Sequence, residues 1–190
     1  MNYYKVLNEN GTPCNGGCGK WHLPRNKQPG KWMPPIEVIK PCVAGYHVCR
    51  RGQLVRWLGP TIWLVEIRGE RICQNDKIVT SQARLLRRVT TWTEKTARLF
   101  AADCAERMLL LYETQYPGDT RPREAIAVAR AFARGEINSA ARAAAWAAAW
   151  DAARAAAGDA AWDAVWDAAR VWQTRRLFKY LDDRRLAGKE

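Results

Sequence analysis

The order of apolar and polar residues predicts two differently built parts in this chain of 190 residues. In the first part, short runs of aromatic and β-branched residues predict strands, because such residues fit a pleated, half-buried surface. The strongest run lies at 61–67, and further strands are expected at 2–8, 45–49 and 71–73. Glycines and prolines interrupt the segment 11–41, so no long helix is expected there.

Shorter elements are expected between these strands. Two short strands are predicted within the glycine- and proline-rich loop, at 20–23 and 36–39. A short helix is predicted at 51–58, because Gly59 and Pro60 follow it directly and stop a helix. Gly69 is expected to end the strand 61–67.

After Asp76 the pattern becomes helical. Thr80 and Ser81 are expected to cap a helix that carries arginines three or four residues apart. Further helices are predicted at about 96–115, from Pro122 to Gly135, at 139–158, and from 159 to about 185.

These elements predict an α+β fold. Residues 1–79 are expected to form a small, mixed, strand-rich module, and residues 80–190 an all-helical bundle rich in alanine and tryptophan. Two tryptophan pairs with a spacing of four residues, Trp146 with Trp150 and Trp162 with Trp166, share a helix face. Large rings between alanines are typical of a seam between packed helices, which is preferred here to an aromatic cage.

Charge separates the same two parts. Residues 1–95 carry 16 Lys and Arg against 6 Asp and Glu, whereas residues 96–190 carry 15 against 13. The net charge of +12 therefore belongs mostly to the N-terminal part, where it favours an anionic partner. The alternative is a basic surface that serves solubility alone.

Two stretches resemble known families. Residues 101–157, with the runs 101–108, 121–126 and 129–137, resemble the immunity-protein-like helical domains of bacteria and their phages. That resemblance implies a helical, non-enzymatic protein. The runs 4–7, 30–34, 42–49 and 63–69 are similar to an uncharacterised domain of phage and bacterial proteins. Together the two resemblances imply an accessory protein of a phage or mobile element.

Cysteine and histidine residues raise the question of metal and catalysis. Cys14 and Cys18 have a spacing that structural zinc sites use, and Cys42, His47 and Cys49 could complete a ligand set. The second group lacks a tight knuckle, so we expect reduced thiols, no metal and no cofactor. No catalytic motif is present, and we expect no enzyme. An ADP-ribosyltransferase-like enzyme that uses Glu66 remains an alternative, because the order of elements is loosely similar.

A basic, aromatic loop is the preferred candidate site. Aromatic faces stack bases, and arginine and lysine bind phosphates. A loop that staples itself to the sheet through its tryptophans is the structural alternative. The candidate ligand-binding residues are Trp21, His22, Arg25, Lys31, Trp32, Tyr46, His47, Arg50 and Arg51.

We therefore expect a non-enzymatic binding protein whose partner is a nucleotide-type anion, with sequestration of a nucleotide immune signal as the most specific form. The alternatives are a nucleic-acid-binding module and an immunity-type protein that docks a protein partner. No membrane partner is expected, and assembly of identical chains through the helical half is left open. The expected location is the cytoplasm, which would be that of the host for a phage protein.

Overall fold

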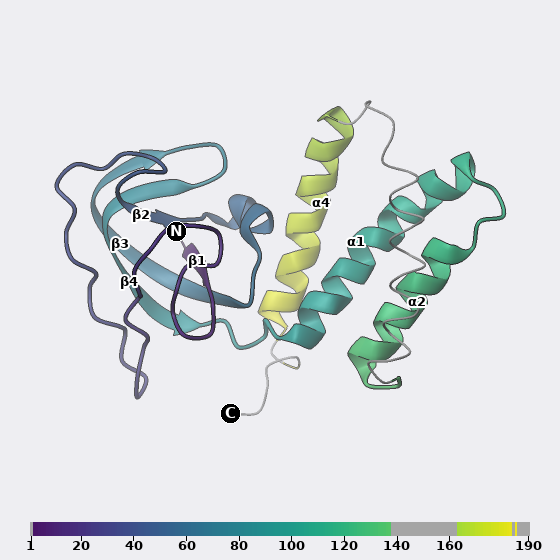
Figure 1. Ribbon diagram of the computed structural model, residues 1–190, viewed down its shortest axis with the longest axis horizontal. Coiled ribbons are helices and arrows are strands. Elements are labelled where there is room, and N and C mark those ends of the chain that lie inside the picture. Colours follow the sequence, from purple (N-terminus) through teal and green to yellow (C-terminus); the bar gives the residue numbers. More distant parts are fainter. Residues whose placement is uncertain (1, 138–162, 184, 186–190) are drawn as a thin grey trace. The chain divides into compact units, whose positions relative to one another are not determined.

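The computed structural model describes residues 2–137, 163–183 and 185. It confirms the α+β class, with an antiparallel sheet followed by helices (Figure 1). The chain divides into two compact units, one made of Met1–Thr93 with Arg170–Glu190 and the other of Glu94–Ala169. The boundary expected between residues 79 and 80 falls inside a strand of the first unit.

Four strands form the sheet of the first unit, in the order β1-β3-β4-β2. They are β1 (Tyr3–Leu7), β2 (Tyr46–Val48), β3 (Thr61–Cys73) and β4 (Ile78–Arg88), and all pairs are antiparallel. Tyr4 and Cys49 join the two edges, because each donates its N–H to the carbonyl of the other at 2.8 Å. The sheet therefore closes on itself and has an inner and an outer face.

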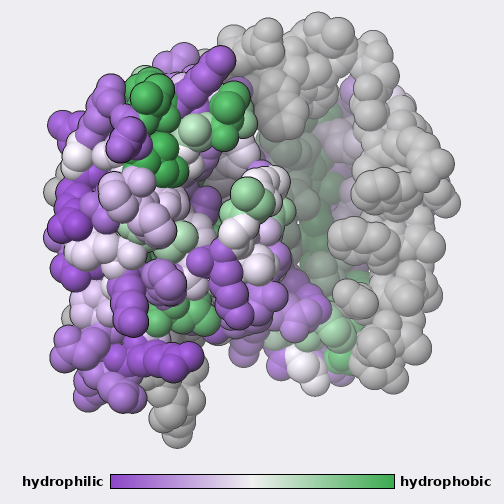
Figure 2. Space-filling model, turned by 60° about the vertical axis from the view of Figure 1, so that its left-hand side comes forward, coloured by the Kyte–Doolittle hydropathy of each residue, from purple (hydrophilic) through white to green (hydrophobic). Residues whose placement is uncertain are grey.

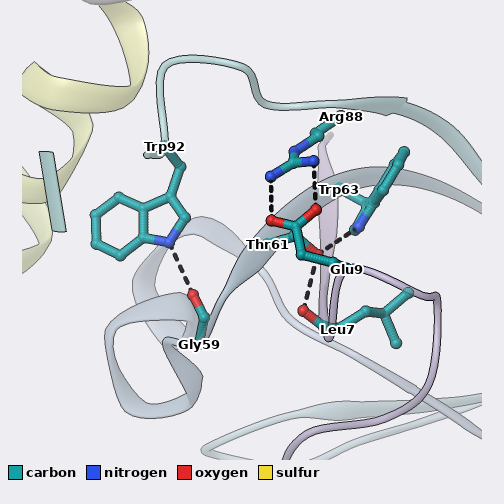
Figure 3. Close-up of polar contacts among 7 residues, drawn as sticks. All are labelled: Leu7, Glu9, Gly59, Thr61, Trp63, Arg88 and Trp92. Carbon is teal, nitrogen blue, oxygen red and sulfur yellow. Dashed lines mark hydrogen bonds and ion pairs between the residues drawn. The ribbon is translucent and has the colours of Figure 1, made fainter. Parts of the chain in front are cut away.

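Residue alternation decides what each face of the sheet receives. Leu7 of β1 packs inward with Trp21, Trp63, Val65 and Leu85 in an apolar cluster of the first unit. A buried polar group anchors this cluster: Thr61 Oγ1 donates to the Leu7 carbonyl at 2.8 Å and accepts from Trp63 Nε1 at 2.7 Å (Figure 3). Because every polar atom here has a partner, the buried hydroxyl carries no desolvation penalty.

The strands expected at 20–23 and 36–39 are not formed. Instead, the segment 30–36 runs along β4, where the N–H groups of Gly30, Met33 and Ile36 donate to β4 carbonyls at 2.8–3.0 Å. A bond at every third residue suits a proline-rich extended segment, in which Pro34 and Pro35 have no N–H to donate. The prolines therefore prevent a regular ladder of strand hydrogen bonds, and the three bonds to β4 hold the segment instead.

The helix expected from residue 80 is wrong, because these residues form β4. Arg84 and Arg87 are three residues apart, which places them on one face of a helix. In a regular strand, residues 84 and 86 would share a face instead. A β-bulge opposite Leu64 and Val65 inserts Leu86 as an extra residue, so Arg84 and Arg87 face the same way in a strand. A bulged strand and a turn of helix can therefore both bring two residues that are three apart in the sequence to the same face.

Gly69 does not end its strand. β3 continues through it to Cys73, with a second register shift between Arg68 and Arg71. Gly69 has a φ of +77°, and a Cβ there would lie 2.2 Å from Ser81 Oγ on the neighbouring strand. Glycine is therefore required by the bulge and the close cross-strand approach.

The remaining expected elements of the first unit are present. The strands 2–8 and 45–49 are confirmed as β1 and β2, and the helix expected at 51–58 is the 3-10 helix η1 (Arg51–Trp57). Trp92 Nε1 donates to the Gly59 carbonyl at 2.9 Å and holds the chain after β4 against the end of this helix (Figure 3). Arg88 forms a two-point ion pair with Glu9 at 2.6 Å.

The second unit contains two of the expected helices, α1 (Glu94–Gln115) and α2 (Arg121–Arg134). They pack through Ala102, Leu109 and Ile126. Arg130 of α2 reaches both Asp103 and Glu106 of α1, at 2.8 and 2.7 Å. Gly135 ends α2 in a left-handed conformation, as expected from the sequence. The helix expected at 139–158 and the residues Trp146, Trp150 and Trp162 lie outside the described residues.

The last helix, α4 (Asp163–Asp182), brings the end of the chain back to the first unit from Arg170 onward. The Phe178 ring packs edge-on against Tyr4 on the outer face of β1, with 5.6 Å between ring centroids. Arg51 of η1 stacks on Phe178 at 3.7 Å, and Thr91 Oγ1 donates to the Leu181 carbonyl at 2.7 Å. The C-terminal helix is therefore part of the core that the N-terminal strands build.

None of the helices in the described ranges is both long and apolar enough to cross a membrane.

Replacing Phe178 with alanine tests this packing. Phe178 is only 2% exposed, so Phe178→Ala should lower the free energy of unfolding by about 3 to 4 kcal/mol, the range for large buried rings. Val171→Ala, on the same helix at a side chain that is 55% exposed, should change it by less than about 0.5 kcal/mol. Urea unfolding followed by circular dichroism measures both. Equal, small effects would mean that this helix does not complete the core.

Candidate anion-binding site

A cavity of about 300 Å³ lies where β1 and β2 meet at the closure of the sheet. Its wall combines strand residues with two loops, one rich in glycine (15–17) and one that carries Cys42. The wall includes the polar residues Lys5, His47 and Lys77, together with Cys49 and Trp57. All of the lining residues belong to the first unit.

Lys5 is the most unusual residue of this wall. It lies between Tyr3 and Leu7 in β1, whose alternation directs it to the inner face of the sheet. Its ammonium donates to the His47 carbonyl at 3.0 Å and lies 5.3 Å from the centroid of the Trp21 ring. Burial lowers the pKa of Lys5, and the nearby Cys49 and Cys14 sulfurs oppose this only in part. Within the described part of the chain, no carboxylate forms an ion pair with it.

His47 completes one side of the site. The Cys42 backbone N–H donates to His47 Nε2 at 3.0 Å, so this nitrogen carries the lone pair and the ring is held in one orientation. Burial lowers the pKa of His47, and the positive charges of Lys5 and Lys77 lower it further. His47 is therefore neutral at physiological pH and adds no charge to those of Lys5 and Lys77.

Lys77 supplies the second ammonium group. It lies 3.4 Å from the Asp76 carboxylate and 5.3 Å from the centroid of the Trp57 ring. A hydrogen bond with Cys42 raises the pKa of Lys77, so its charge is retained. Trp57 Nε1 donates to the Asp76 carbonyl at 2.7 Å, which fixes the turn that carries this pair.

The charges of the wall favour an anion. Lys5 and Lys77 contribute two positive charges, and Asp76 is the one carboxylate that an ion pair brings to them among the described residues. Cys49 is not an available nucleophile, because burial raises the pKa of its thiol to about 12. The described residues contain no group of three His, Cys, Asp or Glu side chains that could hold a metal ion.

The nine residues singled out from the sequence do not lie in one place. Trp21 and Tyr46 pack together on the inner face, with 5.5 Å between ring centroids. Only His47 lines the cavity. His22, Arg25 and Lys31 are exposed on the long loop.

The other three take part in separate contacts. Trp32 lies beneath two arginines on the outer face of the sheet. Arg50 donates to Cys73 Sγ at 3.2 Å, while Arg51 stacks on Phe178 and lies 3.7 Å from Asp182. The aromatic and basic residues of the loop are therefore distributed over both faces of the sheet.

Sequence reasoning missed Lys5 and Lys77. A signal for Lys5 was present, because it shares the inward face of a short strand with Tyr3 and Leu7, where a lysine is unexpected. No such signal marked Lys77, which comes to the site only through the pairing of β4 with β2.

Comparison with known proteins gives one match. The family model described as Imm-5 like putative immunity protein matches residues 87–173. The matched segment contains the whole second unit, Glu94–Ala169, and extends a few residues beyond it at each end. The expected resemblance of the C-terminal half to immunity-protein-like domains is confirmed. No curated protein and no solved structure matches the chain.

Removing the Lys5 charge should stabilise the ligand-free protein. A lysine whose pKa is lowered on folding binds its proton more tightly in the unfolded state, so stability rises with pH between the lowered value and 10.5. Lys5→Met keeps the chain length without the charge and should gain about 1 kcal/mol at pH 7. Thermal melts from pH 7 to 10.5 should show that gain shrinking as the parent protein loses the proton.

Lys20→Met is the matched control, because Lys20 is exposed in the same unit. It should leave both the melting temperature and its pH dependence unchanged. A destabilised Lys5→Met at pH 7 would contradict the view that the His47 carbonyl and the Trp21 ring compensate the half-buried ammonium only in part.

Proposed function

We propose that this protein is a non-enzymatic binding protein that holds a small, nucleotide-type anion in the cavity beside Lys5. The observation that carries the proposal is a half-buried ammonium without a carboxylate partner among the described residues, at a cavity that a second lysine also lines. Burial of a charge is costly unless an opposite charge or hydrogen bonds compensate it. A bound anion would supply that compensation.

The size and lining of the cavity support this class of ligand. A volume of about 300 Å³ lies at the lower end of the range for small-molecule sites. Two ammonium groups match a phosphate, which carries up to two negative charges, and Trp57 offers apolar surface in the same wall. A mononucleotide, or one end of a larger nucleotide signal, combines these properties.

The positions of Glu66 and Cys49, two residues that a reaction could use, support binding without turnover. Glu66, the residue that an ADP-ribosyltransferase-like reaction would need, lies outside the cavity wall and is paired with Arg84 at 2.6 Å. The buried Cys49 thiol stays protonated. A binding protein of this kind would act by lowering the free concentration of its ligand, which is the basis of sequestration of a nucleotide immune signal in counter-defence.

Calorimetric titration with phosphate, mononucleotides and cyclic dinucleotides tests the proposal. Lys5→Met and Lys77→Met should each weaken the bound nucleotide at least tenfold, because each removes a charge-assisted hydrogen bond. Binding should also raise the pKa of Lys5. Titrations at about pH 9 in buffers of different ionisation enthalpy should therefore show proton uptake, which Lys5→Met removes.

The exposed Lys20→Met variant should bind like the parent protein. Failure of every one of these anions to bind below millimolar concentration would overturn the proposal. So would nucleotide binding that is unchanged in Lys5→Met.

The family match favours a second candidate function, the docking of a protein partner by the helical unit. Immunity proteins are named for protection against a toxin, which a helical protein can provide by direct binding. On α1, Leu110 and Leu111 are 73% and 55% exposed, although large apolar side chains are usually covered. These leucines are the candidate contact residues.

Co-expression with the protein encoded by a neighbouring toxin gene tests this candidate. Leu110→Asp with Leu111→Asp should abolish co-purification and protection while leaving the melting temperature of the free protein within about 2 °C, because both side chains are exposed. Lys5→Met should have no effect on protection. Protection that survives the leucine changes would exclude this surface of α1.

A further inference from the structure

The outer face of the β3–β4 ribbon carries a row of arginines that the anion site does not use. Cross-strand neighbours point to the same side of a sheet, so the register places Arg87 beside Leu64, Arg84 beside Glu66, and Arg68 beside Gln82. The three arginines therefore follow one another along one face. From Leu64 to Arg68, β3 advances by four residue steps, so the row of arginines extends over about 13 Å.

Two of these arginines are held in place by Trp32. The guanidinium carbon of Arg68 lies 4.1 Å from the centroid of the Trp32 ring, and that of Arg84 lies 4.7 Å from it. Trp32 itself is fixed because the next residue, Met33, donates its N–H to Ala83 of β4 and accepts from Gln82 Nε2. Stacking on an aromatic face orders a guanidinium without consuming its N–H groups.

Hydrogen bonds complete the orientation of Arg68. Its Nε donates to Gln82 Oε1 at 2.6 Å, and within residues 2–137, 163–183 and 185 its two terminal nitrogens have no protein partner. Arg84 donates through Nε and one terminal nitrogen to Glu66, and Arg87 is exposed. The ribbon thus presents ordered guanidinium groups with donors left over, and less of their side-chain entropy remains to be lost on binding.

We propose that this face, formed by Arg68, Arg84, Arg87 and Trp32, binds the phosphodiester backbone of a nucleic acid. A planar guanidinium with two free N–H groups matches two oxygens of one phosphate. Arg68 meets this condition among the described residues, and Arg84, which is paired with Glu66, and the exposed Arg87 extend the positive row. Three arginines in a line match a ligand with regularly repeated charge better than a compact anion. Figure 2 shows that hydrophilic residues cover much of one face of the molecule, with separate apolar patches among them.

This surface is independent of the cavity beside Lys5. Arg68, Arg84 and Arg87 do not line the cavity, and Lys5 points to the inner face of the sheet while these arginines point outward. Nucleic-acid binding and nucleotide binding can therefore be removed separately.

Fluorescence anisotropy with labelled 20-nucleotide single strands and 20-base-pair duplexes tests the proposal. Three phosphate contacts give a slope of log affinity against log salt of about −3 for a duplex and about −2 for a single strand. Arg68→Met with Arg87→Met should weaken binding at least tenfold. Because one phosphate contact remains, the slope should flatten to about −1 or to a value closer to zero. The ligand that binds more tightly and with the steeper salt dependence, single strand or duplex, is the form of nucleic acid that this face binds.

Arg56→Met with Lys95→Met is the matched control, because both residues are exposed and the loss of charge is the same. It should bind like the parent protein, and melting curves should show all variants folded. Arg68→Lys, which keeps the charge and removes the planar fork, should lose several-fold in affinity.

Three results would overturn the proposal. One is equal weakening by the control and the arginine variants, which would show a general field effect. Another is loss of binding in Lys5→Met, which would place the phosphates in the cavity. The third is competition by polyglutamate as effective as that by nucleic acid at equal charge, which would indicate an acidic protein as the partner.

Discussion

Two backbone hydrogen bonds between Tyr4 and Cys49 determine most of what the first unit can do. By joining β1 to the end of β2, they close the sheet and give each residue of β1 a fixed side. Tyr4 then faces outward, where Phe178 covers it, and Lys5 faces inward, where the cavity lies. A shift of one residue in this pairing would exchange the two, because strand side chains alternate.

The inward position of Lys5 illustrates a conflict between stability and binding. An apolar residue would pack there at no electrostatic cost, whereas the ammonium is desolvated and its pKa is lowered. The ammonium groups of Lys5 and Lys77 both lie near His47 and lower its pKa, in addition to the effect of burial. Such an arrangement opposes folding by itself, and an anion bound beside Lys5 would offset that cost. That balance is the physical basis of the proposed anion site.

The helical unit and the sheet unit differ in chemistry as well as in architecture. In the sheet unit, cations lie on both faces, with lysines at the cavity and stacked arginines outside. In the helical unit, arginines of α2 form ion pairs with acidic residues of α1, as Arg130 does with Asp103 and Arg123 with Glu113. The family match falls on this second unit. The proposed partner docking and the proposed anion binding therefore rest on different units of the chain.

The sequence by itself determined the elements that depend on local chemistry. The run of β-forming residues at 61–67, the glycine at position 135 and the proline at 122 each act through the backbone of their own segment, and the corresponding strand and helix are present. The excess of positive charge in residues 1–95 was equally readable, because charge is a sum over residues.

Only the tertiary structure decided the identity of β4 and the location of the site. The spacing of Arg84 and Arg87 fits a helix turn or a bulged strand, and only the pairing with β3 distinguishes them. Lys5, His47 and Lys77 lie far apart in the sequence and meet because β2 pairs with β4 while Cys49 pairs with Tyr4. Such contacts depend on strand register and sheet closure, which are cooperative properties of the whole unit and leave no mark on any single segment.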